Sequence, residues 1–114
     1  MINWNELSTL SNLEKAVEQS FTHPIVIFKH STRCPISQMA LDRFERKWDA
    51  SIADGFETYF LDLIAHREIS NMIASQMEVQ HESPQVLVIR DGKCVYSETH
   101  QAIRVEDVLS SIKN

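Results

Sequence analysis

The sequence is poor in glycine, proline and cysteine. It has 114 residues but only two glycines, three prolines and two cysteines. These counts exclude a Gly- or Pro-rich linker, a low-complexity tract and a framework of several disulfides. They also exclude a phosphate-binding loop, which needs closely spaced glycines. Internal repeats are absent too, so the chain is not an array of small units.

An excess of positive charge and long apolar runs are also lacking. The 11 Lys and Arg residues are outnumbered by 16 Asp and Glu, and the net charge is -5. Such a chain has no surplus of cations for nucleic-acid phosphates or an anionic membrane. Apolar runs such as residues 25–28 are far shorter than the roughly 20 residues that cross a bilayer. Residues 1–7 do not resemble an export signal. We expect a cytoplasmic protein with protein or small-molecule partners, and neither nucleic-acid nor membrane binding.

Helix and strand signals alternate along the chain in the order α-β-α-β-α-β-β-α. Helices are predicted over residues 12–20, 35–50, 66–77 and 105–112, and strands over 25–30, 56–62, 86–89 and 94–97. The crossover helix makes the first two strands parallel, and an Asp-Gly turn makes the last two a hairpin. The order predicts an α/β fold with a four-stranded mixed sheet flanked by helices. With 43% hydrophobic residues, the chain fits a single domain over residues 1–114.

Two helices carry more detailed predictions. Ser11 to Glu14 fits a capping box at the start of the first helix, and Asp54-Gly55 marks a break after the second. In the second helix the predicted buried stripe repeats every four residues and includes Trp48 as a packing anchor. Its members are Ile36, Ala40, Phe44 and Trp48, with Met39 alongside.

The residues with the clearest chemistry surround Cys34, in the stretch HSTRCPIS at positions 30–37. Cys34 follows a predicted buried strand, and Pro35 suits the first position of a helix. The sulfur would therefore lie near unpaired backbone N–H groups and the positive end of the helix dipole, which favour the thiolate. Arg33 adds a fixed positive charge, and Ser37, one turn on, can donate a hydrogen bond to the sulfur. We predict a nucleophilic thiol rather than a small buried hydrophobe.

Ser37 stands where a second cysteine would complete a Cys-x-x-Cys pair. A mixed disulfide formed on Cys34 therefore has no neighbouring thiol to expel it and must wait for a thiol from outside. The site is predicted to be monothiol. The alternative role for Ser37, which lies in the first helical turn, is to satisfy backbone donors. Lys29 and His30 are further candidate sources of positive charge beside the sulfur.

Two separate segments carry a family resemblance. Residues 28–37 (FKHSTRCPIS) and 81–85 (HESPQ) resemble the monothiol bacilliredoxin family, and nearly the whole chain matches the thioredoxin element order without an extra leading strand. The resemblance implies a thioredoxin-like fold and a thiol–disulfide oxidoreductase that removes bacillithiol from protein cysteines. It also implies bacillithiolated proteins and a low-molecular-weight thiol as partners. Bacillithiol would be the co-substrate, with no bound cofactor.

A second segment, Ser83-Pro84, precedes the predicted hairpin. Taken with the upstream thiol, it predicts a cis peptide bond whose Ser83 backbone offers N–H and C=O groups to an extended substrate; the alternative is a trans proline opening a strand. We also place Thr32 and Pro35, beside the thiol, among the substrate-binding residues. His100 ends the return strand near this site and is expected over the carboxylates of a bound thiol, or else as a solvated surface histidine.

The remaining cysteine and histidines have simpler interpretations. Cys94 starts the return strand of the hairpin, about 15–20 Å from the end where Cys34 lies at roughly 3.3 Å per residue. We interpret it as structural and not as a disulfide partner of Cys34. His23, His66 and His81 have no Cys or carboxylate at ligand spacing, so we predict no metal site and expect them in solvated loops.

Two other function classes fit the same residues. One is an iron–sulfur module like the monothiol glutaredoxins, with Cys34 and an external thiol as ligands. Those proteins carry Gly and Phe where Pro35-Ile36 stands here. The other is a redox-sensing interaction domain in which Cys34 is modified without turnover. Absorbance of anaerobically purified protein and turnover kinetics distinguish these classes.

Overall fold

β2 (Ile25–His30) is the central strand of a five-stranded sheet in the computed structural model, which describes residues 2–48 and 57–113. The strand order is β1-β3-β2-β4-β5. The other strands are β1 (Asn5–Glu6), β3 (Glu57–Asp62), β4 (Gln85–Arg90) and β5 (Lys93–Thr99). β2 runs parallel to β3 and antiparallel to β4, while β5 runs antiparallel to β4. The predicted α/β fold with a mixed sheet is confirmed.

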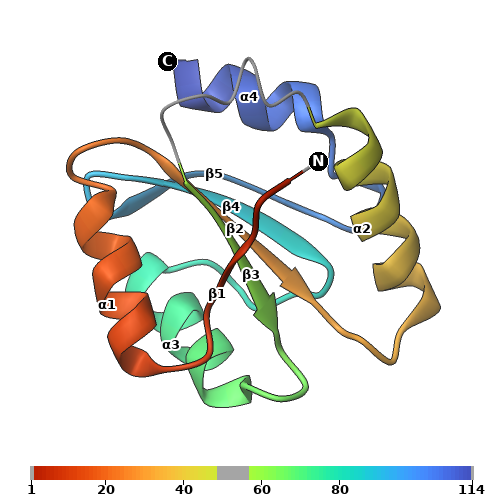
Figure 1. Cartoon of the computed structure of the whole chain (residues 1–114), viewed down its shortest axis with the longest axis horizontal. Helices are drawn as coiled ribbons and strands as arrows, with labels where there is room; N and C mark the ends of the chain where they lie inside the picture. The colour runs from red at the N-terminus through yellow and green to blue at the C-terminus, as the bar shows by residue number, and fades with distance from the viewer. Residues whose placement is uncertain (1, 49–56, 114) are drawn as a thin grey trace.

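Helices cover both faces of this sheet (Figure 1). α1 (Leu10–Gln19) and α3 (Arg67–Met77) pack on one face, and α2 (Pro35–Lys47) and α4 (Val105–Lys113) pack on the other. A short 3₁₀ helix, η1 (His100–Ala102), connects β5 to α4. Neighbouring side chains on a strand point to opposite faces of the sheet. Every side chain of β2 is buried because helices cover both of these faces.

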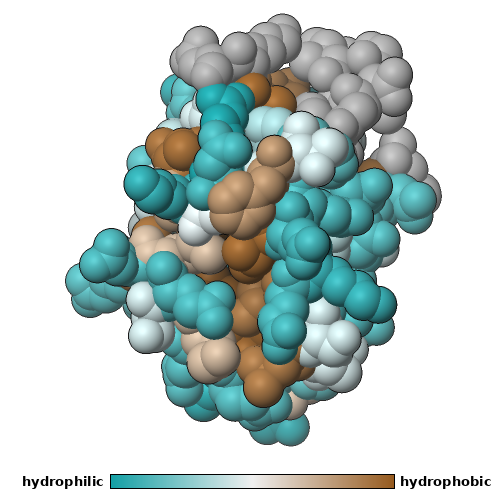
Figure 2. Space-filling view, turned by 90° about the vertical axis from the view of Figure 1, so that its left-hand side faces the viewer, coloured by the Kyte–Doolittle hydropathy of each residue, from teal (hydrophilic) through white to brown (hydrophobic). Residues whose placement is uncertain are grey.

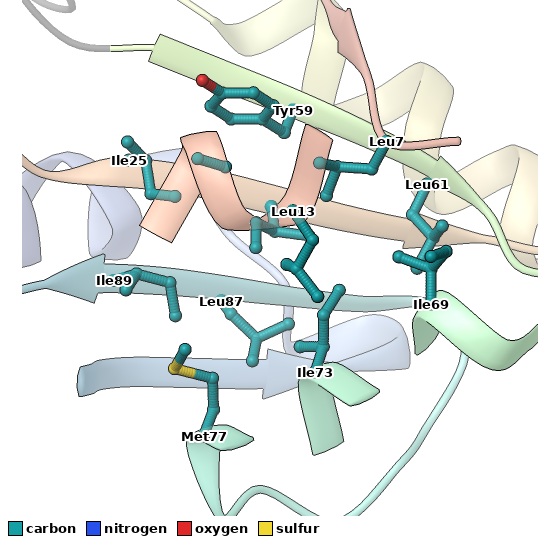
Figure 3. Packing of buried hydrophobic residues seen from close by; sticks show 12 residues of the cluster. Leu7, Leu13, Ile25, Tyr59, Leu61, Ile69, Ile73, Met77, Leu87 and Ile89 are labelled. Carbon is teal, nitrogen blue, oxygen red and sulfur yellow. The ribbon is translucent and has the colours of Figure 1, made fainter. Parts of the chain in front are cut away.

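The core between the sheet and the α1–α3 layer is aliphatic. Figure 3 shows Leu13 of α1 and Ile73 of α3 near Leu87 of β4, while Ile69 of α3 lies against Leu61 of β3. Each of these five side chains is at most 2% exposed. At about 25 cal/mol per Å² of buried apolar surface, such contacts are the main stabilising term for this layer.

The core on the α2–α4 side contains a group of aromatic rings. Phe28 and Phe44 pack with centroids 5.3 Å apart, and Trp48 stacks on Phe44 at 5.4 Å, which confirms its predicted packing role. Trp4, to which the sequence assigned no role, packs against Phe28, Phe44 and Phe60 at 5.9–6.2 Å. Its indole N–H donates to a Glu45 carboxylate oxygen over 2.8 Å.

The prediction of four strands is wrong by one. β1 adds a fifth strand at the edge, where Asn5 pairs with Tyr59 and Glu6 with Phe60. A strand of two residues shows no alternating pattern, so sequence periodicity cannot reveal it. It places the neighbouring Trp4 against the aromatic core.

Two helix details also differ from the prediction. α1 begins at Leu10, and Thr9 is its cap, accepting the Asn12 N–H over 3.0 Å, so the predicted capping box at Ser11 is wrong. In α2, Ile36 and Met39 are 57% and 66% exposed. The buried stripe instead consists of Ser37, Ala40, Leu41 and Phe44. α2 ends at Lys47, and Trp48 is already extended (ψ 130°), so the predicted end near residue 50 is too late. The predicted Asp54-Gly55 break lies outside the described residues.

The hairpin between β4 and β5 turns at Asp91-Gly92, as predicted. Both residues have positive φ, 53° and 76°, as a two-residue hairpin turn requires. The turn is held to the end of α1, because the Asp91 N–H donates to the Ser20 carbonyl over 2.8 Å and the Gly92 N–H donates to the Ser20 hydroxyl over 2.9 Å. We refer to Asp91, Gly92 and Cys94 as the hairpin edge.

The outer surface of the α1–α3 layer carries an apolar strip between hydrophilic side chains (Figure 2). A groove of about 680 Å³ on this layer is lined in part by Val17, Phe21 and Glu18. Phe21 is 61% exposed and its ring faces Gly92 of the turn, so the groove reaches the hairpin edge.

Candidate redox site at the carboxyl edge of the sheet

Four connections meet at the edge where the parallel strands β2 and β3 end. The Cys34 loop follows β2, residues 63–66 follow β3, Ser83-Pro84 precedes β4, and η1 follows β5. Hydrogen bonds join them in pairs. The Leu63 N–H donates to the His30 carbonyl over 3.0 Å, and the His100 N–H donates to the Pro84 carbonyl over 3.1 Å. We refer to this region as the carboxyl edge.

Cys34 is the N-cap of α2, with Pro35 at the first helical position as predicted. Its backbone is extended (φ -109°, ψ 115°), and its carbonyl accepts the first helical bond from the Gln38 N–H over 3.0 Å. Amides of the first helical turn have no partner within the helix. A thiolate at the N-cap can accept from them, as capping oxygens do elsewhere. The half-buried sulfur is thus placed for nucleophilic chemistry.

Ser37 is completely buried one turn into α2. Its hydroxyl accepts the Ser31 N–H over 3.1 Å and shares a 2.7 Å hydrogen bond with His30 Nδ1. It therefore satisfies a backbone donor, which was the alternative role named for it. The predicted bond from Ser37 to the Cys34 sulfur remains a prediction.

His30 faces the α2 side and is 2% exposed, with its ring 5.6 Å from that of Phe60. Burial lowers the pKa of His30 below its ordinary 6.5. The ring is therefore neutral at neutral pH, and the expected positive charge from His30 is absent there.

Lys29 faces the α3 side and is completely buried. Its ammonium donates to the Ser70 carbonyl over 3.3 Å and to His81 Nδ1 over 3.4 Å. The Ser70 hydroxyl also lies 3.0 Å from His81 Nδ1. Burial lowers the pKa of Lys29 to about 8, so it remains mostly cationic at neutral pH. Burial, aided by Lys29, lowers the pKa of His81. His81 is therefore not the solvated loop residue that we expected.

The peptide bond between Ser83 and Pro84 is cis, as predicted. Pro84 is buried, and its carbonyl is the acceptor for the His100 N–H. His100 has a positive φ of 52°, and its own carbonyl accepts a bond from Arg43 Nη2 of α2 over 3.5 Å. The structure thus brings His100 to the carboxyl edge, where it was predicted to lie.

The residues flanking the thiol are open to solvent. Thr32, Arg33 and Pro35 are exposed, and so are the apolar side chains of Ile36 and Met39 in the first turns of α2. The roles predicted for Thr32, Arg33 and Pro35 stay predictions, but each side chain is accessible to a partner. An apolar group beside a half-buried thiol is suited to a protein partner.

Cys94 lies at the opposite end of the sheet. It pairs with Ile89, which pairs with Ile25 at the start of β2, whereas Cys34 follows the end of β2. Its thiol donates to the Tyr96 carbonyl over 3.2 Å, and burial raises its pKa. Both cysteines are free. The placement agrees with a structural Cys94.

Residues 2–48 and 57–113 contain no group of three His, Cys, Asp or Glu side chains that could hold a metal ion. In the same described part of the chain, no helix is long and apolar enough to span a bilayer.

The fold and the single thiol at the start of α2 define a thioredoxin-fold thiol protein. The family model described as monothiol bacilliredoxin BrxC matches residues 5–108. The chain therefore belongs to the monothiol bacilliredoxin family, and the resemblance inferred from residues 28–37 and 81–85 is confirmed.

Solved structures agree with this assignment. A candidate oxidoreductase with a thioredoxin fold is 30% identical, with a TM-score of 0.79 over 93% of this chain and 90% of that one. Thioredoxin from Malassezia sympodialis is 14% identical, with a TM-score of 0.76 over 99% and 90% of the two chains. Fasciola hepatica thioredoxin is 20% identical, with a TM-score of 0.69 over 96% of each chain. The two thioredoxins show the fold alone, while the family supports thiol–disulfide oxidoreductase chemistry.

Proposed function

We propose that this protein removes bacillithiol from mixed disulfides on protein cysteines, with Cys34 as the nucleophile. The observation that carries the proposal is a half-buried thiol at the N-cap of α2 with a buried serine hydroxyl, Ser37, in place of a second thiol. Such a site exchanges disulfides but cannot close an internal one. The protein would act in the cytoplasm without a bound cofactor.

The reaction consists of two exchanges. In the first, the Cys34 thiolate attacks the bacillithiol sulfur of the mixed disulfide, that disulfide breaks, and the substrate protein leaves as a thiolate that takes a proton from water. Cys34 then carries bacillithiol. In the second, the thiolate of another bacillithiol attacks that adduct, which releases bacillithiol disulfide and restores Cys34. Overall, the thiol of the second bacillithiol is oxidised into bacillithiol disulfide, and the substrate cysteine is reduced from the mixed disulfide to a thiol.

The surroundings of Cys34 supply what each step needs. First-turn amides of α2 and the neighbouring cation Arg33 would favour the thiolate that attacks. The exposed Ile36 and Met39 offer an apolar contact to a protein partner. The Ser83 backbone, before Pro84, would pair with an extended segment of that partner. Thr32 and Pro35 flank the place where the small thiol would lie.

The test is release of bacillithiol from a purified, bacillithiolated protein. We expect wild type to release it catalytically when bacillithiol is supplied, and Cys34→Ser to leave only the background rate. Cys94→Ser is the matched control, because it removes the other thiol and should release bacillithiol like wild type. Equal release by wild type and Cys34→Ser would contradict the proposal. Visible absorbance of the anaerobically purified protein would instead support the iron–sulfur alternative.

A further inference from the structure

A small groove lies between α2, η1 and the start of α4. Its volume is about 300 Å³, and its lining includes three cations: Arg43 and Lys47 from α2, and Arg104 just before α4. The floor is apolar, since Phe44 and Ile103 are each 2% exposed. This volume fits part of a small molecule rather than a folded segment of a protein.

The charge of this groove is opposite to that of the whole chain. Arg43 and Lys47 are four residues apart on one helix face, an arrangement that repels by a few tenths of a kcal/mol. Against the three cations stands one lining carboxylate, Glu106, whose oxygen is 3.8 Å from Arg104 Nε. An anion in the groove would offset this repulsion, although the chain as a whole carries a net charge of -5.

The groove is connected to the Cys34 site. Arg43 donates to the His100 carbonyl over 3.5 Å, and the His100 N–H donates to the Pro84 carbonyl over 3.1 Å. His100 thus links the groove residue Arg43 to Pro84 at the carboxyl edge. Arg43 is nine residues after Cys34, about 13 Å along the helix axis, and helical side chains lean back toward the N-terminus. A ligand joined to the Cys34 sulfur can therefore extend toward Arg43 first; Lys47 lies one helical turn farther on, and Arg104 lines the groove from just before α4.

We infer that this groove binds carboxylate groups of the small thiol that is exchanged at Cys34. The inference rests on the proposed function and adds a source of selectivity to it. A thiol that carries carboxylates gains contacts with Lys47 and Arg104 while its sulfur reacts, and a neutral thiol does not. Because the cations are largely exposed, each contact should contribute modestly and weaken as salt screens it.

The experiment compares two symmetrical disulfides as oxidants of reduced protein. One is bacillithiol disulfide, which bears carboxylates, and the other is hydroxyethyl disulfide, which is neutral. In each, the Cys34 thiolate attacks one sulfur and the other sulfur leaves as a thiolate. Lys47→Gln and Arg104→Gln should each slow the reaction with bacillithiol disulfide about two- to fivefold. Neither should change the reaction with the neutral disulfide, and Glu106→Gln should accelerate only the first reaction.

Lys15→Gln is the matched control, since it removes one exposed cation from α1 on the other face of the sheet. It should change neither rate. In about 1 M salt the differences between the variants should disappear. The inference is overturned if Lys47→Gln and Arg104→Gln slow both disulfides equally, or if Lys15→Gln has the same effect as they do. It is also overturned if they slow only exchange with protein disulfides, because the groove then recognises the protein partner.

This test does not depend on release from proteins. If wild type releases no bacillithiol from modified proteins, the proposed function fails, yet the two small disulfides still report the selectivity of the groove. If release proceeds but the variants show no selectivity, only the inference about the groove fails.

Discussion

The two edges of the sheet each hold a cysteine in a different setting. At the carboxyl edge, Cys34 caps α2 next to the exposed Arg33. At the hairpin edge, Cys94 sits on a strand, donates to a carbonyl and has a raised pKa because of burial. The comparison teaches that the two thiols differ in placement: one caps the start of a helix, where first-turn amides have no partner within the helix, and the other lies on a strand, where burial favours its neutral form.

The edges also differ in buried polar groups. Lys29, His30, Ser37 and Gln85 are each at most 2% exposed, and all belong to the carboxyl edge. Next to the hairpin edge, buried Ser20 at the end of α1 holds the turn with its carbonyl and hydroxyl. Buried polar groups cost stability unless they are well paired, so the carboxyl edge combines function with a stability penalty. The following predictions test this contrast.

The largest expected effect comes from Ser37→Cys. A second thiol placed one turn from Cys34 would attack an adduct on it from within the chain, with a high effective concentration. Without added thiol, the lifetime of the adduct should fall roughly 100-fold or more. Mass spectrometry over time measures this loss and the internal disulfide that replaces the adduct. Ser97→Cys, on β5, is the control and should leave the lifetime unchanged; an equally persistent adduct in Ser37→Cys would contradict the monothiol account.

Lys29→Met should change how stability depends on pH. The pKa of Lys29 is lowered from 10.5 to about 8 by burial. Between these values the unfolded chain keeps the proton that the folded chain releases, so Lys29 makes the free energy of unfolding rise with pH. This rise in the free energy of unfolding is at most about 3 kcal/mol. Below about pH 8 the folded chain bears the full cost of burying a charged Lys29.

Urea unfolding of both proteins across that pH range measures the effect. The chain with Lys29 should gain stability relative to Lys29→Met as pH rises. Both proteins carry Cys94→Ser, because the Lys29 charge lowers the pKa of Cys94 and that contribution would not cancel. Comparing them cancels the opposing contributions of Tyr59 and Tyr96, whose pKa values are raised by burial. Parallel pH curves for the two proteins would show that Lys29 does not titrate in this way.

Gly92→Ala should destabilise the hairpin edge without affecting exchange. Gly92 has φ of 76°, and an added Cβ would lie 2.7 Å from Phe21 Cζ. Because left-handed backbone is strained for alanine, we expect a loss of about 1–2 kcal/mol in unfolding free energy. Denaturant titration measures this loss, and the disulfide exchange rate under native conditions should stay at the wild-type value. A matching fall in that rate would mean that the two edges are coupled.

The smallest effect is expected for Cys94→Ser. The half-buried thiol donates a weak bond to the Tyr96 carbonyl, which a hydroxyl can also make. Unfolding free energy should change by about 1 kcal/mol or less. Peptide mapping after brief alkylation of native wild type should find the label on Cys34, with Cys94 protected. Equal labelling of both cysteines would contradict the contrast between the edges.

Much of this arrangement could be predicted from particular residues. The run 25–28 and the helix signal at Pro35 located the central strand and the thiol at the helix start, and the Cys34 and Ser83-Pro84 segments indicated the family. The Asp91-Gly92 pair predicted the turn between the last two strands, at the end of the sheet opposite Cys34. These features are local or have a fixed spacing, so sequence is enough to find them.

Side-chain contacts across the fold could not be predicted in the same way. Ser37 is bonded to His30 and Ser31, and Lys29 to Ser70 and His81, because distant elements meet at one edge. One signal was available: a lysine ending a strand buried on both faces requires polar partners. The partners themselves depend on how α3 and the segment before Pro84 pack.

The most direct test of the central claim is an ultraviolet titration of thiolate absorbance in Cys94→Ser, which leaves Cys34 alone, compared with Cys34→Ser, which leaves Cys94 alone. We predict a substantial thiolate signal for Cys94→Ser at neutral pH, and a signal for Cys34→Ser only in alkaline solution. The account is contradicted if Cys34 and Cys94 ionise over the same alkaline range.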